Sequence, residues 1–288
     1  MNGLTPTRVT TQTGDEREPS FSPDGTLIAF VKGVTGAIYV VDTLGGEPRL
    51  VVEPSRAHNP RFSPDGRLLT YWAGQPPWAT SSVTAGTGSL FVVEAAGGLP
   101  RPVAASFAQA RYGTWSPDGR KLLLLGEPQH DTGESSLDWY VVPVDGGEAV
   151  RTGALTALRE AGVKGLPIPS GWERKDGTVT FATDDDGASN VWQLRIATDT
   201  GRVAGSPRRL TFGTAVERSP ATSSSGLVVF TSIVENIDVW RLPLDGRTGG
   251  ARGAPERVTD DAARDMVMSV SADGRTLAFL SSRTGRDE

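Results

Sequence analysis

Short apolar runs recur along the whole chain, each only four or five residues long. Runs of this length are typical of strands that are buried on both faces. Polar segments with glycine and proline separate them, and no amphipathic helical pattern of any length competes with this interpretation. The pattern therefore predicts six buried strands, at residues 27–31, 68–72, 122–125, 179–182, 228–231 and 277–280.

A repeated turn stands in front of each run. Phe21-Ser22-Pro23-Asp24-Gly25 is almost duplicated at 62–66 and 115–119, and decayed copies follow at 174–177, 223–226 and 271–274. Proline presets the first corner of a type I turn, aspartate caps the turn, and glycine takes the left-handed position after it. The turn glycines lie 41 to 58 residues apart, near the period of about 40–50 residues in propeller blades, at 25, 66, 119, 177, 226 and 274.

Two further strand patterns complete most repeats. The third strand has an aromatic residue beside β-branched ones, as at 38–41, 90–93, 139–142, 191–194 and 239–242. The fourth is a short stretch that contains arginine, as at 49–51, 101–103, 150–151, 208–211 and 256–259. Four strands in each of six units predict an all-β fold, a six-bladed β-propeller. We expect one domain over residues 1–288, with blades near 17–52, 58–104, 111–153, 169–211, 218–259 and 266–288 plus 7–10.

The sixth repeat is incomplete, because the chain ends soon after its second strand. Residues 7–10 (Thr-Arg-Val-Thr) match the fourth-strand pattern of residues 256–259. We expect this N-terminal strand to close the ring, since propellers avoid open sheet edges by closure. One strand would still be missing between the two, so the pattern favours a chain cut within a blade of a longer protein.

Composition narrows the classes of partner. The net charge is −5 with both signs mixed throughout, which predicts no nucleic-acid partner. No apolar stretch approaches the roughly 18 residues of a membrane span, so we expect no membrane insertion. The first residues lack a signal-peptide pattern. The chain has no cysteine, which excludes disulfides and thiolate metal sites and leaves the cell compartment open.

The Phe-Ser-Pro-Asp-Gly turns and the Ile-Tyr-Val or Val-Trp strands that follow them resemble the TolB-like, WD40-like propeller repeats of bacteria. The segment 188–211 is similar to propellers appended to bacterial serine/threonine kinases or winged-helix regulators. The resemblance implies a non-catalytic scaffold that binds a protein or peptide partner, as the docking or sensory part of a larger protein. The resemblance to TolB-like propellers also implies a periplasmic location. The alternative is the accessory, substrate-gating propeller of a prolyl-oligopeptidase-type serine peptidase.

Candidate catalytic and metal-binding groups are sparse. Residues 187–191 (Gly-Ala-Ser-Asn-Val) lack the second glycine of a hydrolase nucleophile elbow. His58 and His130 are the only histidines, too few for a multi-histidine metal site. Residues 184–187 (Asp-Asp-Asp-Gly) could ligate calcium but lack EF-hand spacing, so we expect a solvated hairpin. With Glu173 as a lone inward carboxylate, we expect no enzyme activity, no metal and no cofactor.

A set of cationic residues is expected at the mouth of the central channel. The position eight before each turn glycine should lie there, and it holds Arg17, His58, Arg111, Pro169, Arg218 and Met266. Cationic side chains around a low-dielectric funnel attract anions and can grip a carboxylate. We expect the three arginines and the histidine to bind an anionic group of a partner. In the alternative interpretation the arginines pair with Glu18 or Glu217 and only hold loops in place.

The long loops offer a second surface. The loop at 73–89 holds Trp78 among prolines and glycines, and loops of comparable length are expected at 127–138 and 154–170. An exposed tryptophan is a frequent hot spot in protein interfaces. We expect Trp78 to contact a protein partner, with packing back onto the sheet as the alternative.

Overall fold

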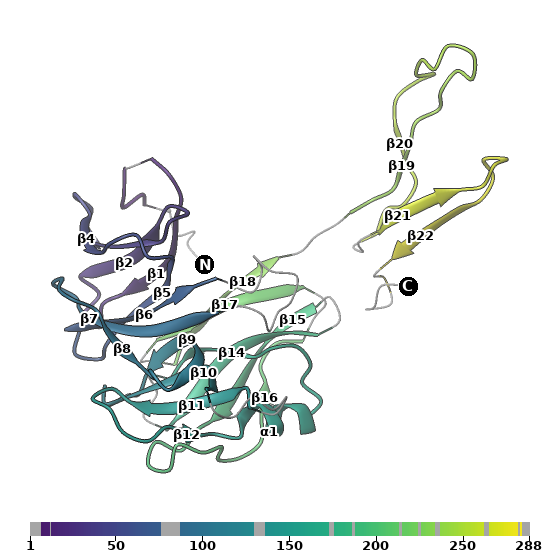
Figure 1. The fold of residues 1–288 in the computed structure, drawn as a ribbon. Coiled ribbons are helices and arrows are strands. Elements are labelled where there is room, and N and C mark those ends of the chain that lie inside the picture. The colour runs from purple at the N-terminus through teal and green to yellow at the C-terminus, as the bar shows by residue number, and fades with distance from the viewer. Residues whose placement is uncertain are drawn as a thin grey trace.

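The computed structural model consists almost entirely of β-strands in small antiparallel sheets (Figure 1). It describes residues 7–11, 13–75, 87–129, 136–172, 176–185, 188–212, 215–223, 226–233, 237–261, 265–281 and 283. Each of the first three repeats forms a sheet of four strands in chain order. These are β1 (Glu16–Phe21), β2 (Leu27–Lys32), β3 (Ala37–Asp42) and β4 (Arg49–Val52); β5 (Ala57–Phe62), β6 (Leu68–Gly74), β7 (Gly88–Glu94) and β8 (Arg101–Val103); and β9 (Phe107–Trp115), β10 (Lys121–Pro128), β11 (Asp138–Pro143) and β12 (Val150–Arg151).

The fourth repeat continues this series and joins the fifth. Its strands are β13 (Ile168–Gly171), β14 (Thr178–Asp185), β15 (Ala188–Arg195) and β16 (Arg208–Arg209). A single parallel bridge, between Ser189 and Val216, connects β15 to β17 (Val216–Thr222). β17 in turn pairs antiparallel with β18 (Val228–Ile233).

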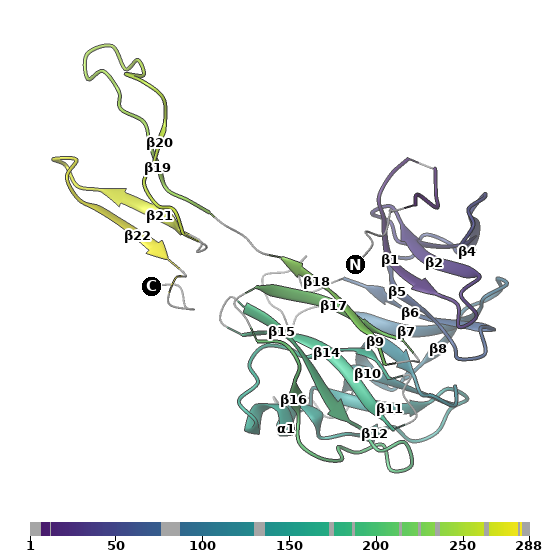
Figure 2. The ribbon, with the colours of Figure 1, turned by 180° about the vertical axis from the view of Figure 1, so that it is seen from behind.

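The last four strands form two separate ribbons. β19 (Trp240–Arg241) pairs with β20 (Glu256–Arg257), and β21 (Asp265–Val270) pairs with β22 (Leu277–Ser281). Both ribbons project from the body of the molecule (Figures 1 and 2). The all-β class is therefore confirmed, and these strands lie at the expected residues. Six complete blades, and closure of the ring by residues 7–10, which form no strand here, stay predictions.

The repeated turn has the structure that its residues predict. Gly25 N–H donates to Ser22 O at 2.9 Å, and Ser22 Oγ donates to Asp24 Oδ1 at 2.6 Å. Gly25 has a φ of 73°, in the left-handed region that favours glycine. The same serine-to-aspartate bond recurs at Asp65, Asp118 and Asp273. Because every bond of the turn is local, five residues suffice to specify the connection between the first and second strands.

The second strands of the first four repeats have buried centres, whereas β18 is largely exposed and β22 is only partly buried, so the prediction of six buried strands is wrong for the last two. Leu122, Leu123, Leu124 and Leu125 are all fully buried in β10. Indole groups add hydrogen bonds between sheets: Trp115 Nε1 donates to Arg61 O at 3.0 Å, and Trp139 Nε1 donates to Pro167 O at 2.9 Å. Each sheet thus covers a face that its neighbour could not bury alone.

One short helix was not predicted from the sequence. Residues Ala154–Glu160 form α1, inside a segment expected to be a loop. Ala154 and Leu158 lie four residues apart on one helical face, and both are buried. A helix of seven residues is too short to produce an apolar period in the sequence, so tertiary burial stabilises it. Among the described residues no helix is long and apolar enough to cross a membrane.

Shortening a buried side chain of β10 should destabilise the folded protein. We expect Leu124→Ala to lower the free energy of unfolding by about 2–5 kcal/mol, because it removes buried methyl groups and leaves a cavity. Leu99→Ala, at a side chain that is 96% exposed, should change the free energy by less than about 0.5 kcal/mol. Urea unfolding followed by circular dichroism measures both, and equal effects would contradict the packing described.

Candidate functional site

Each innermost strand contains a β-bulge at the same place. The pairing of β1 with β2 shifts between Arg17 and Ser20, and an equivalent shift recurs in β5, β9, β13, β17 and β21. Four of these bulges hold a non-glycine residue in the left-handed region, with φ between 51° and 57°: Glu18, Asn59, Tyr112 and Ser219. Such values are uncommon outside glycine. A bulge turns a side chain in a new direction, here the same one in successive repeats.

The bulge residues line a cavity of about 930 Å³. In each of the first five repeats, the residue seven positions before the turn glycine lines this cavity: Glu18, Asn59, Tyr112, Ser170 and Ser219. α1 and the segment after it add apolar residues, among them Leu155, Leu158 and Val163. Ligand sites typically combine apolar walls with a few convergent polar groups, and this cavity has both.

The structure separates the four cationic residues expected at the channel mouth. Arg218 lines the cavity, and within the described residues its guanidinium forms no hydrogen bond or ion pair. Arg17 instead donates from Nη2 to Gly33 O at 3.0 Å. His58 is buried, with its ring stacked 4.3 Å from that of Trp72. Binding of an anion by the four residues stays a prediction.

Glu18 connects the first two innermost strands. Its carboxylate accepts a hydrogen bond from Asn59 N–H at 2.7 Å and lies 3.4 Å from His58 Nδ1. Burial alone would raise the pKa of Glu18, but the hydrogen bonds from His58 and Asn59 outweigh it and hold the pKa below its ordinary value. Glu217 accepts a hydrogen bond from Thr211. In the described part of the chain, neither carboxylate forms the arginine ion pair of the alternative interpretation.

Arg111 lies between the second and third sheets rather than in the cavity. Its side chain is 0% exposed, and none of its three guanidinium nitrogens has a hydrogen-bond partner within the described ranges. The guanidinium carbon lies 5.9 Å from the ring centroid of Tyr112. Burial lowers the pKa of Arg111, while Tyr112 and Glu127 act in the opposite direction. A buried cation without hydrogen bonds destabilises the fold that contains it.

Two hydroxyl groups beside the cavity are also without partners. Tyr112 and Thr114 line the cavity from β9, and both side chains are at least nine-tenths buried. Among the described residues neither hydroxyl has a hydrogen-bond partner. Buried hydroxyls are normally hydrogen-bonded, so these two are exceptions, and both oxygen atoms are themselves closed to solvent.

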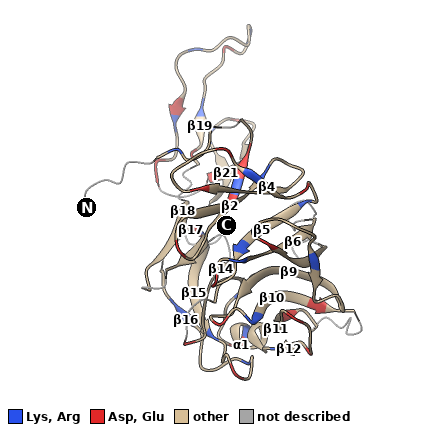
Figure 3. Cartoon of the chain, turned by 90° about the vertical axis from the view of Figure 1, so that its left-hand side faces the viewer, with Lys and Arg blue, Asp and Glu red and all other residues tan. Residues whose placement is uncertain are grey.

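Only some of the other candidate residues lie in the described part of the chain. Ser189, from the elbow-like segment, is buried and donates to Glu217 O at 2.6 Å. Where the chain is described, no group of three or more His, Cys, Asp or Glu could hold a metal ion. Basic and acidic residues are interspersed along the strands (Figure 3). The remaining candidates lie outside the described residues: Trp78, His130, Glu173, Asp186 and Gly187.

The cavity-lining position was missed by the sequence reasoning, although it leaves a signal. Pro19, Pro60 and Pro220 stand six positions before their turn glycines. Proline inside a strand removes a ladder donor, so it is tolerated at edges and bulges. The recurrence of proline at this position could have indicated the bulge. The residue just before each proline is the one that lines the cavity.

No protein-family model and no curated protein sequence matches the chain. Solved structures do match. A protein described as a TolB from Agrobacterium tumefaciens is 20% identical with a TM-score of 0.56, over 92% of this chain and 80% of that one. TolB from Acinetobacter baumannii is 19% identical with a TM-score of 0.53, over 96% of this chain and 56% of that one. At such identities the likeness shows the fold alone: the chain has a TolB-like β-propeller fold, which confirms the resemblance seen in its repeats.

Peptidase propellers are also among the similar structures. Acylaminoacyl peptidase from Pyrococcus horikoshii is 14% identical with a TM-score of 0.44, over 93% of this chain and 50% of that one. A likeness of this size carries no argument about function. The chain thus spans about half of the Acinetobacter TolB and of the peptidase.

Removal of the buried cation should stabilise the protein. We expect Arg111→Met to raise the free energy of unfolding by about 1–4 kcal/mol, since an apolar side chain of similar length avoids the cost of desolvating the guanidinium. Arg101→Met is the control, because the partly exposed Arg101 donates to Val144 O at 2.6 Å, and its loss should cost about 1 kcal/mol. Urea denaturation measures both; destabilisation by Arg111→Met would show that the cation is paired in solution.

Glu18 should make stability depend on pH. Its pKa is lower in the folded protein than the ordinary 4.5, so its stabilising effect is present above pH 4.5 and is lost as the pH falls through the folded value. We expect Glu18→Gln to cost about 1 kcal/mol at pH 7 and less at pH 3.5. Urea unfolding across this range, with the exposed Glu53→Gln as control, tests the expectation. A difference between wild type and Glu18→Gln that does not change with pH would contradict it.

Proposed function

We propose that this chain is a non-catalytic binding domain that docks a protein or peptide partner through an acidic group, as the docking or sensory part of a larger bacterial protein. The observation that carries the proposal is the cavity of about 930 Å³, which the same position of the innermost strand lines in each of the first five repeats. Repeats that direct equivalent side chains to one place build a shared binding surface rather than five separate ones.

The polar groups of the cavity favour an anion. Arg218 lines the cavity, is exposed to solvent and forms no ion pair among the described residues. Charge-assisted hydrogen bonds to a carboxylate are about twice as strong as neutral ones. Glu18 competes little, because its carboxylate is already occupied by Asn59 and His58. A role for Arg17, His58 and Arg111 in such binding is a prediction from their sequence positions.

The apolar part of the cavity adds selectivity. Leu155, Leu158 and Val163 would contact an apolar side chain beside the acidic group. The serine of the elbow-like segment is not placed as a nucleophile, because the hydroxyl of Ser189 is buried and donates to a backbone carbonyl.

A paired peptide array tests the proposal. Peptides of twelve residues are synthesised in two forms, one with Asp, Glu and a free C-terminus and one with Asn, Gln and a C-terminal amide, and are probed with the fluorescently labelled chain. We expect binding to the acidic forms only. Arg218→Glu should weaken it by about 10-fold or more, because one charge-assisted hydrogen bond is replaced by repulsion.

Arg247→Glu is the matched control for this experiment. Arg247 is exposed between β19 and β20, and it does not line the cavity. The charge change is the same, so non-specific electrostatic attraction would fall equally in both variants. Equal binding of acidic and amide peptides, or equal losses in the two variants, would refute the proposal.

A further inference from the structure

One face of α1 forms part of the cavity wall. The helix lies in the chain between β12 and β13 (Figure 1). Leu155, Leu158 and Arg159 all line the cavity. Residues three and four positions apart lie on the same side of a helix, so these side chains form one continuous surface. That surface is apolar except at Arg159, in the last turn of the helix.

Both ends of α1 are held by hydrogen bonds. At the start, the buried carboxylate of Asp138 on β11 accepts from Leu155 N–H at 3.1 Å. At the end, Gly162 has a φ of 79° and its N–H donates to Arg159 O at 3.0 Å, while Val163 N–H donates to the preceding carbonyl at 2.9 Å. This pair of bonds is the Schellman motif that commonly ends helices. The backbone that carries Leu155 and Arg159 is therefore fixed before any ligand binds.

The apolar part of the wall beside α1 remains accessible. Leu137, Leu155, Leu166 and Ile168 all line the cavity, and each is only partly buried. They pack against the main buried cluster of the protein, which holds them in place. An aliphatic side chain of a ligand would cover the surface that they still expose, and burial of apolar surface favours such contact.

Cations outnumber carboxylates on the described part of the cavity wall. Arg61, Arg159 and Arg218 line it, against the single carboxylate of Glu18. Arg159 and Arg218 are exposed, and within the described ranges their guanidinium groups form no hydrogen bond or ion pair. Cationic side chains that converge on one concave site raise the local concentration of anions. The wall thus combines an apolar surface with unpaired positive charge.

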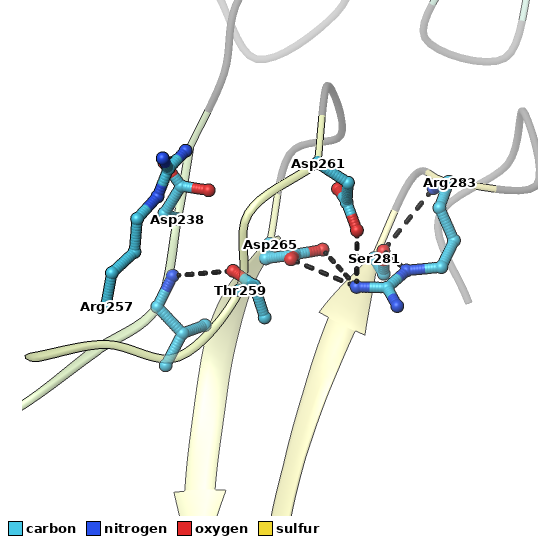
Figure 4. A network of polar contacts seen from close by, with 8 residues as sticks. Asp238, Arg257, Thr259, Asp261, Asp265, Ser281 and Arg283 are labelled. Atoms are coloured by element: carbon cyan, nitrogen blue, oxygen red, sulfur yellow. Dashed lines mark hydrogen bonds and ion pairs between the residues drawn. The ribbon is translucent and has the colours of Figure 1, made fainter.

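Other arginines of the chain are paired with carboxylates. In the projecting ribbons, Arg257 Nη2 lies 2.6 Å from Asp238 Oδ2, and Arg283 Nη2 lies 3.1 Å from Asp265 Oδ2 (Figure 4). Arg159 has no such partner among the described residues. A ligand carboxylate would supply to Arg159 the kind of contact that these two arginines already have.

We propose that the acidic group of the partner is the α-carboxylate of a peptide C-terminus that ends in a large aliphatic residue. The carboxylate pairs with Arg159, and the last side chain lies against Leu155 and its apolar neighbours. This inference rests on the proposed function, because it names the acidic group that the cavity binds.

The spacing on α1 favours a C-terminus over an internal acidic residue. Side chains four positions apart on a helix have Cβ atoms about 5–6 Å from each other. A C-terminal residue carries its carboxylate and its side chain on the same Cα, so it can contact Leu155 and Arg159 together. In an extended peptide, adjacent side chains point to opposite sides, so an internal acid and its apolar neighbour cannot both face one side of α1.

Four pools of fluorescently labelled octapeptides test the proposal, with fluorescence anisotropy of the intact chain as the measurement. The internal positions are random mixtures of Gly, Ser and Ala. The pools end in Leu with a free carboxylate, in Leu amide, in Gly with a free carboxylate, or in Leu amide with one central Asp. We expect the first pool to bind about 10-fold more tightly than the others, because each of these lacks one of the two groups or separates them.

Two variants assign the contacts. Arg159→Gln should weaken binding of the Leu acid by about 10-fold and leave the Leu amide unchanged, since it removes a charge-assisted hydrogen bond. Leu155→Ala should reduce the preference for Leu over Gly and keep the preference for acid over amide. A merely structural role of α1 would weaken all pools equally. Arg247→Gln is the control, because Arg247 is exposed and does not line the cavity.

The outcomes separate this inference from the proposed function. If the pool with central Asp binds as tightly as the Leu acid, the inference is wrong and the proposed function stands. If all four pools bind equally, both are wrong. Equal binding of the Leu and Gly acids, or unchanged affinity of Arg159→Gln for the Leu acid, would overturn the inference alone.

Discussion

Burial of both faces of each second strand is the constraint on which this molecule depends. A four-stranded sheet cannot bury its own two faces, so each sheet is stable only between two others. The contrast within the chain is direct: the leucines of β10 are fully buried, whereas Val229 and Phe230 of β18 are exposed. The indole N–H groups of Trp115 and Trp139 add hydrogen bonds between neighbouring sheets to this packing. The bond of Trp115 joins two innermost strands, β9 and β5, and the bond of Trp139 joins the third strand β11 to the residue before β13.

The strands and turns could be predicted from the sequence because their determinants are local. The bonds among Ser22, Asp24 and Gly25 lie within one turn. The helix α1 could not be predicted, because the burial of Leu158 that stabilises it comes from tertiary contacts. The direction of the channel residues depends on the bulge, which adds one residue to each innermost strand. Counting eight residues back from the turn glycine therefore selected Arg111 as a channel residue, whereas the next residue, Tyr112, is the one that lines the cavity.

Arg111 and Arg218 occupy the same position in two repeats and have opposite environments. Arg111 is enclosed between sheets, beside Tyr112 and Gly88, where a guanidinium costs stability. Arg218 borders the cavity and is exposed to solvent, so its guanidinium pays little desolvation cost and can contact a ligand. Sequence position alone does not reveal which role a repeated arginine has.

An arginine of the fourth strand joins each of the first two repeats to its successor, because Arg49 donates to Ala95 O and Arg101 donates to Val144 O; both acceptors are backbone oxygens. Any residue supplies such an acceptor, so the partner sequence is free to diverge while the hydrogen bond persists. A genetic duplication or deletion of one whole repeat would therefore still encode matching interfaces. The circumference of such a ring, and the width of the cavity at its centre, can thus change in a single evolutionary event.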